Sequence, residues 1–196
     1  MNTSRRHFVK SGALGALAVS VSGFVLFEKG KYVGDCATTS DVLGPFYRPE
    51  APFRSNLILN GQSGTSVIVK GRVFSHCSEP LKQATVDIWH CDGGGEYDNT
   101  SDLFNCRGRQ LTTAAGDYQF TTINPPPYGN RPKHIHFRVY AEGHQELISQ
   151  LYFKGDPTLS RQGSAWQRHT EARILPTSRN AEGVDEITFD IYLRAV

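Results

Sequence analysis

The chain is organised around residues 125–139, which read Pro-Pro-Pro-Tyr-Gly-Asn-Arg-Pro-Lys-His-Ile-His-Phe-Arg-Val. From residue 134 onward polar and apolar side chains alternate, which is the pattern of a β-strand. His134 and His136 stand at positions i and i+2, so both imidazoles leave the same face, roughly 6.5–7 Å apart along the strand. This spacing lets two ring nitrogens converge on one metal ion. The stretch therefore predicts a strand that carries part of a metal site.

Further short strands are predicted on both sides of this stretch. Turns rich in glycine, proline and asparagine separate them, and only the polar segment 154–169 is expected to contain a short helix. We expect an all-β fold, an antiparallel β-sandwich with long connecting loops. The expected strands, from their β-branched content and alternation, are 67–74, 84–91, 109–112, 117–123, 137–141, 147–153 and 187–193.

Composition limits the kind of protein this can be. A length of 196 residues allows one domain or two small ones. The formal net charge is only +2, and no Lys/Arg cluster occurs beyond the N-terminus, so neither a nucleic acid nor an anionic membrane is expected as a partner. Ten prolines and nineteen glycines favour a loop-rich β protein.

The N-terminus has the features of an export signal. Arg5 and Arg6 precede the soft apolar stretch 12–27, and this order predicts a twin-arginine signal peptide and a periplasmic or extracellular destination. The stretch is shorter than the ~20 apolar residues of a spanning helix, so no stable membrane insertion is expected after its removal. An uncleaved N-terminal anchor is the alternative. The expected organisation is a signal peptide (1–27), an exposed leader (28–40) and one domain (41–196).

Four cysteines fit an oxidising destination. None of them forms a C-x-x-C element, so a zinc knuckle is not expected. One or two disulfides are expected, but four cysteines allow three pairings, and buried free thiols are a further alternative. The cysteines are Cys36, Cys77, Cys91 and Cys106.

An ordered set of motifs extends over residues 43–157. It comprises Val-Asp-Ile-Trp-His-Cys at 86–91, Gly-Glu-Tyr at 95–97, Gly-Asp-Tyr-Gln-Phe-Thr-Thr-Ile at 116–123, Pro-Tyr at 127–128, Arg-Pro-Lys-His-Ile-His-Phe at 131–137 and Leu-Ile-Ser-Gln-Leu-Tyr-Phe-Lys-Gly-Asp at 147–156. This set resembles the intradiol ring-cleavage dioxygenases of the catechol 1,2-dioxygenase and protocatechuate 3,4-dioxygenase type.

The resemblance implies one mononuclear non-haem Fe(III) ion. Matched by motif, its ligands are Tyr97, Tyr128, His134 and His136. A free phenol has a pKa near 10, but a bound cation stabilises the phenolate and removes its proton. Two phenolates suit a hard trivalent ion, and two imidazoles complete the set.

The resemblance also implies a reaction and its residues. A catechol-type ring is expected to be cleaved by O2 between its two hydroxyl-bearing carbons, giving a cis,cis-muconate-type diacid. Arg131, Tyr128 and Gln150 match the catalytic positions, and Arg131 and Gln150 are also expected to bind substrate. Trp89 and Tyr47 are expected to line the substrate pocket.

Some features depart from the family pattern and leave the substrate open. The loop between Tyr128 and Arg131 is very short, and prolines precede Tyr128 where a glycine is frequent. The oligomeric state is also open, and a homo-oligomer is compatible with the sequence. One alternative is a metal-free transthyretin-like sandwich that serves as a binding module. Another is a different non-haem metalloenzyme with two histidines and one carboxylate, for which Glu96 is the nearby candidate.

Overall fold

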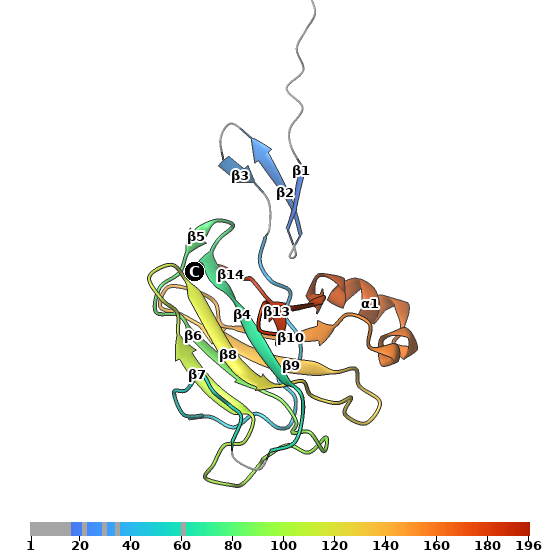
Figure 1. Cartoon of the computed structure of the whole chain (residues 1–196). Helices are drawn as coiled ribbons and strands as arrows, with labels where there is room; N and C mark the ends of the chain where they lie inside the picture. The colour runs from blue at the N-terminus through green and yellow to red at the C-terminus, as the bar shows by residue number, and fades with distance from the viewer. Residues whose placement is uncertain (1–16, 21–22, 29–30, 34–35, 60–61) are drawn as a thin grey trace, which may run out of the picture.

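The strand predicted within residues 125–139 lies at the centre of a five-stranded sheet. In the computed structural model, which describes residues 17–20, 23–28, 31–33, 36–59 and 62–196, this strand is β9 (His134–Tyr140). The strands of the sheet follow the order β11-β10-β9-β6-β7 (Figure 1). The other four are β6 (Thr85–Trp89), β7 (Arg107–Leu111), β10 (Leu147–Phe153) and β11 (Ile174–Leu175).

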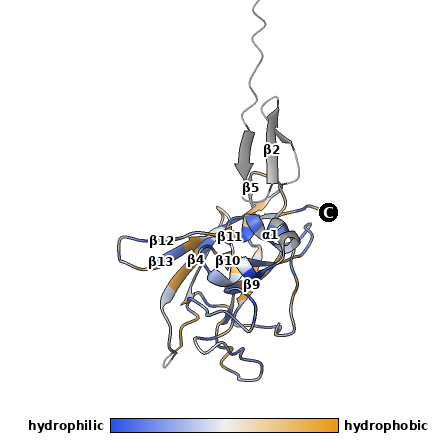
Figure 2. Ribbon diagram, turned by 90° about the vertical axis from the view of Figure 1, so that its right-hand side faces the viewer, coloured by the Kyte–Doolittle hydropathy of each residue, from blue (hydrophilic) through white to orange (hydrophobic). Residues whose placement is uncertain are grey.

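The second sheet is built on the long strand β4 (Ser66–Ser75). β8 (Asp117–Ile123) pairs antiparallel along one edge of β4, and β13 (Asp185–Thr188) and β14 (Ile191–Leu193) follow each other along the opposite edge. β12 (Thr177–Arg179) pairs with β13, and the two form a hairpin that extends away from the body in Figure 2. β5 (Glu79–Pro80) pairs with the end of β4. The predicted all-β sandwich is thus confirmed.

Two details of the second sheet differ from the prediction. Residues 187–193 were expected to form one strand in an antiparallel system, but they are divided between β13 and β14, and both pair parallel with β4. Between β13 and β14, the Tyr118 hydroxyl donates to the carbonyl oxygen of Phe189 at 2.6 Å. A Cβ at Gly71 would clash with the same carbonyl, so the close approach of the two strands requires glycine there. β11 also pairs parallel, with β10.

The core fills the space between the two sheets. Alternation along β9 turns Ile135, Phe137 and Val139 inward, where they are fully buried. They meet apolar side chains from β4, β6 and β8 in one continuous cluster. Burying each large apolar side chain contributes about 1.5–3 kcal/mol. This packing fixes the face on which His134 and His136 stand.

The outer face of the five-stranded sheet is covered as well. The short helix predicted within 154–169 is present as α1 (Ser164–Thr170), preceded by η1 (Pro157–Arg161) and followed by η2 (Glu171–Arg173). Figure 2 shows α1 beside β10 and β11. Within the described residues, no helix has the length and apolar character needed to cross a membrane.

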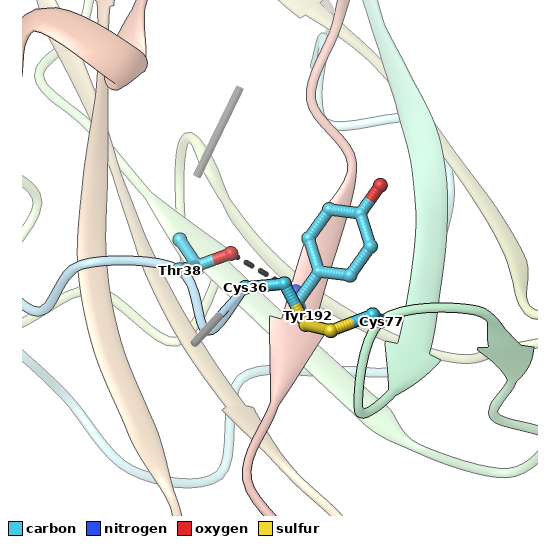
Figure 3. The surroundings of a disulfide bond; sticks show 4 residues. All are labelled: Cys36, Thr38, Cys77 and Tyr192. Atoms are coloured by element: carbon cyan, nitrogen blue, oxygen red, sulfur yellow. Dashed lines mark hydrogen bonds between the residues drawn. A yellow bond between two sulfur atoms is a disulfide. The ribbon is translucent and has the colours of Figure 1, made fainter. Parts of the chain in front are cut away.

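Residues 36–42 form a segment that is fastened to both sheets. Cys36 is disulfide-bonded to Cys77, and the Tyr192 amide donates to the Thr38 hydroxyl at 2.9 Å (Figure 3). The exposure expected for residues 28–40 is therefore wrong for Cys36 and Thr38, which are buried against β14. The other two cysteines, Cys91 and Cys106, are buried thiols.

Three short strands precede this segment. β1 (Leu17–Ser20), β2 (Gly23–Glu28) and β3 (Lys31–Val33) form a small antiparallel sheet, drawn apart from the sandwich in Figure 1. The paired arginines of the predicted signal peptide lie outside the described residues.

Candidate metal centre

Strand register assembles the site in two rows on the outer face of the sheet. Trp89 of β6 and Gln150 of β10 both pair with His136 of β9, so the three side chains share one face. Tyr152 pairs with His134 in the next row. Residues far apart in sequence are thereby placed side by side by the ladder alone.

His134 is held with one ring nitrogen free to bind a cation. Its Nδ1 lies 2.6 Å from the carbonyl oxygen of Pro132, and because a carbonyl only accepts, Nδ1 carries the proton. Nε2 therefore presents its lone pair, 3.3 Å from the Tyr97 hydroxyl. Burial, together with the charge of Arg131, lowers the pKa of His134 to about 4, so the imidazole is neutral at ordinary pH.

His136 is equally buried, with 2% of its surface exposed. Burial and the neighbouring His134 keep the pKa of His136 well below the usual histidine range. Its Nδ1 is buried without a hydrogen-bond partner, which is costly unless a further group is bound nearby. The loop at 43–49 closes over this ring: Gly44 has φ +76°, and a Cβ there would lie 3.2 Å from the His136 Cε1 atom.

Tyr97 contacts His134, and Tyr128 contacts Tyr97 from a different loop. The Tyr97 ring is stacked on Phe46 at 4.5 Å and meets the Tyr128 ring edge-on at 5.4 Å. Burial raises the pKa of Tyr97 well above the ordinary phenol value, so the hydroxyl is protonated when no cation is present. Tyr128 is half-buried. The structure thus brings together all four predicted ligands.

Arg131 follows Tyr128 in a tight turn. The Arg131 amide donates to the Tyr128 carbonyl at 2.9 Å, and Gly129 between them has φ +55°. The Arg131 Nη2 group donates to the Gln150 Oε1 atom at 2.7 Å and to the Tyr152 hydroxyl at 3.3 Å. The short loop therefore places Arg131 next to Gln150, which pairs with the predicted ligand His136 in the sheet.

Comparison with known proteins identifies relatives of this chain. A family model described as "Dioxygenase" matches residues 42–195. The chain belongs to the intradiol dioxygenase family. Catechol 1,2-dioxygenase 2 of Acinetobacter lwoffii is 32% identical over 207 residues, a match that covers 88% of this chain and 73% of that protein. The protocatechuate 3,4-dioxygenase beta chain of Burkholderia cepacia is 33% identical, with 60% and 56% covered.

Solved structures of the intradiol dioxygenase family share the fold. The dioxygenase domain of a dioxygenase carbohydrate-binding protein fusion from Streptomyces sp. SirexAA-E matches with a TM-score of 0.73 and 34% identity, covering 82% of this chain and 99% of that chain. Several curated relatives are much longer than this chain, which spans 46%, 58% and 56% of the length of three of them.

The residues of this dioxygenase fit a ferric ion. Two phenols and two neutral imidazoles match a hard trivalent cation, the Nε2 lone pair of His134 is available, and a ring nitrogen of His136 lacks a partner. In the described part of the chain, no group of three His, Cys, Asp or Glu side chains is placed to hold a metal. Glu96, the candidate carboxylate ligand of the alternative centre, is exposed.

Trp89 contacts the predicted ligand His136, and Tyr47 contacts Trp89. The indole of Trp89 is 1% exposed and stacks on the His136 ring, with centroids 4.7 Å apart and 9° between planes. Tyr47 packs edge-on against Trp89, and its hydroxyl donates to Asp87 at 3.1 Å and accepts from Arg138 at 2.7 Å. This geometry makes both residues supports of His136, and their contact with substrate stays a prediction.

Sequence reasoning missed several residues of the site. Phe46 lies in the aromatic loop at 43–49 but was not assigned to the centre, although its ring stacks on Tyr97. Tyr152 stands two residues after Gln150 on the same strand face, which is a signal that could have revealed it. Asp41 and Arg173 carry no local signal.

A groove separate from the site lies on the outside of the second sheet. It has a volume of about 900 Å³, and none of the predicted site residues lines it. It runs along the outside of β4 and β8, beside Phe53, Arg109 and Leu111. The site is therefore recognised by its donor groups and not by cavity size.

Proposed function

We propose that this chain is an Fe(III)-dependent intradiol dioxygenase. It cleaves a catechol-type ring between the two hydroxyl-bearing carbons with O2 and releases a cis,cis-muconate-type diacid. The observation that carries the proposal is the convergence of two phenols and two neutral imidazoles beside an arginine, in a chain that belongs to the intradiol dioxygenase family.

The ferric ion is held by Tyr97, Tyr128, His134 and His136. When bound, it supplies a Lewis acid that favours the catecholate form of the substrate and withdraws electron density from its ring. Two of these four rings are oriented by neighbouring aromatic side chains, because Phe46 stacks on Tyr97 and Trp89 stacks on His136.

Tyr128 receives a proton from the substrate. It is the less buried of the two tyrosines, so a catechol hydroxyl can approach its phenolate oxygen more easily than that of Tyr97. A phenolate and a catechol have similar proton affinities, which makes the transfer between these oxygens nearly balanced.

Arg131 stabilises negative charge on the bound ring. Its planar guanidinium donates through Nη2 to the Gln150 Oε1 atom and to the Tyr152 hydroxyl, which fix its orientation. The Gln150 amide is itself occupied, since its nitrogen donates to the Val42 carbonyl at 2.7 Å. Gln150 therefore contributes to catalysis by orienting Arg131. A preorganised cation of this kind lowers the barrier without reorganising during the reaction.

A single preparation tests the proposal. The purified protein is assayed for iron by elemental analysis and for tyrosinate-to-iron absorption in the visible range. A panel of catechol, protocatechuate, and chlorinated and hydroxylated catechols is then followed by O2 uptake and by muconate absorbance. We expect a red, iron-containing protein that consumes one O2 per diacid formed. A folded, colourless, iron-free protein that leaves every catechol intact would falsify the proposal.

We also propose export by the twin-arginine route, with residues 1–27 as signal and the catalytic domain in residues 41–196. The paired Arg5 and Arg6 before an apolar stretch support it, and the Cys36–Cys77 disulfide suits an oxidising destination. We expect the Arg5→Lys/Arg6→Lys variant to remain in the cytoplasm. The protein with the native sequence should be exported, and Edman sequencing should show that its N-terminus has been shortened. Export that is unaffected by the double substitution would contradict this route.

A further inference from the structure

Tyr152 connects the Arg131 guanidinium to the N-terminal segment. Its hydroxyl accepts from the Arg131 Nη2 group at 3.3 Å and lies 3.0 Å from both the Asp41 Oδ2 atom and the Gln150 Oε1 atom. A phenol has one proton to donate, and a carboxylate is a stronger acceptor than an amide oxygen. The proton therefore goes to Asp41, and the Gln150 oxygen is left to receive Arg131.

Asp41 is itself fixed from three directions. Arg173, with only 1% of its side chain exposed, donates from Nη1 to the Asp41 Oδ2 atom at 2.6 Å. The same Nη1 group donates to the Gln150 carbonyl at 2.8 Å, and the Asp41 amide donates to the Ile148 carbonyl at 2.8 Å. All three partners of Asp41 are therefore tied to β10: Ile148 and Tyr152 belong to this strand, and Arg173 is bonded to its backbone.

Segment 36–42, which carries Asp41, is attached to the fold at both ends and in the middle. It is anchored by the Cys36–Cys77 disulfide at one end, and the Gln150 amide nitrogen holds the Val42 carbonyl at the other. Between them, Thr39 accepts hydrogen bonds from the Ser149 hydroxyl and from Arg173, both at 2.9 Å. A disulfide-anchored segment thus ends at the residues that hold Arg131.

We infer that Asp41 and Tyr152 are positioning residues that fix the direction of the Arg131 guanidinium, which makes segment 36–42 part of the catalytic apparatus. The inference rests on the proposed function, because its readout is the charge that Arg131 offers to a catecholate. Asp41 holds the Tyr152 proton, Tyr152 then offers its lone pair to Arg131, and Gln150 completes the support. Without Asp41, the Tyr152 hydroxyl has Gln150 Oε1 as its remaining described acceptor, where it competes with Arg131.

The decisive experiment is a double-mutant cycle on the iron-loaded full chain. Tyr152→Phe, Arg131→Ala and the combined variant are compared with wild type, using the best substrate of the catechol panel. We expect Tyr152→Phe to lower kcat/KM about 10-fold to 100-fold, the effect of losing one hydrogen bond to a charged group. In the Arg131→Ala background the same substitution should have no further effect. Equal losses in both backgrounds would overturn the inference.

Readouts other than turnover separate positioning from folding. Iron content, visible absorption and the binding of 4-nitrocatechol without O2 are measured on each variant. We expect unchanged iron and colour but weaker 4-nitrocatechol binding in Tyr152→Phe. The matched control is Tyr118→Phe, which also deletes a buried hydroxyl but lies in the second sheet, where it donates to Phe189 at 2.6 Å. It should lower Tm without changing kcat/KM.

Substitutions of Asp41 provide a second test. Asp41→Ala should resemble Tyr152→Phe, and Asp41→Asn should recover part of the activity, because its amide oxygen still accepts the Tyr152 proton. Wild-type kcat/KM in both Tyr152→Phe and Asp41→Ala would overturn the inference while leaving the proposed function intact. So would losses of activity that only follow losses of iron or Tm. A wild-type protein that cleaves no catechol would overturn the proposed function, and the inference with it.

Discussion

Removing the Cys36–Cys77 disulfide should cost stability that can be calculated from its position in the chain. The two cysteines are 41 residues apart. In the chain-entropy description, a crosslink over a loop of that length disfavours the unfolded state by about 4 kcal/mol at 25 °C. For a chain of this size, such a loss lowers Tm by about 8–16 °C.

The assay is urea unfolding of a Cys36→Ser/Cys77→Ser variant, followed by tryptophan fluorescence and circular dichroism. A lower midpoint with an unchanged m value would assign the loss to stability alone. Reductant provides the control: it should bring the wild-type midpoint down to that of the variant and leave the variant unchanged.

Two results would refute this reasoning. A wild-type midpoint that is insensitive to reductant would mean that the crosslink does not limit the unfolded chain. A variant that loses its catechol-cleaving activity with no change in midpoint would mean that the disulfide acts on the native segment 36–42 and not through the unfolded state.

Three further outcomes are expected. Tyr97→Phe should lose iron and visible absorption. Tyr128→Phe should retain iron by elemental analysis but bind catechols more slowly in stopped-flow spectra. Identical iron loss in both variants would contradict the different roles inferred from the burial of Tyr97 and the partial exposure of Tyr128. Trp89→Leu should lower iron occupancy in metal titrations, because the indole stacks on His136 at 4.7 Å, and full occupancy would show that the stacking is dispensable. Burial lowers the pKa of His90 from 6.5 to about 4, so protons bind the unfolded state preferentially and stability should fall by about 3 kcal/mol as pH decreases from 6.5 to 4. Urea midpoints across this range should be flatter in His90→Gln, and parallel profiles would exclude His90 as the cause.

Local pattern was sufficient where one strand carried the information. Residues 117–123 and 147–153 were predicted as strands with the bounds that β8 and β10 have. The placement of His134 and His136 on one face followed from alternation alone. Family motifs then supplied Tyr97 and Tyr128, whose loops have no periodicity of their own.

What the sequence did not reveal depends on contacts between distant segments. Asp41 and Arg173 are 132 residues apart, and neither has a neighbour in sequence that hints at the other. β13 and β14 pair parallel with β4, and between them the Tyr118 hydroxyl donates to the Phe189 carbonyl; these are contacts between distant segments, which strand propensity does not predict. Residues 28–40 were expected to be an exposed leader, but Thr38 and Thr39 have their polar groups satisfied by residues of both sheets and of η2.

With the proposed iron site, the row formed by Trp89, His136 and Gln150 makes metal uptake depend on correct strand pairing. Side chains alternate along β9, so a slip of one residue against its neighbours would turn Ile135 outward and bury both histidines in the apolar core. Misaligned molecules would therefore lose core packing and ligands together. The iron-to-protein ratio of a fresh preparation should then equal the fraction of molecules whose strands are correctly paired. Metal stoichiometry would therefore measure how much of a preparation is correctly folded.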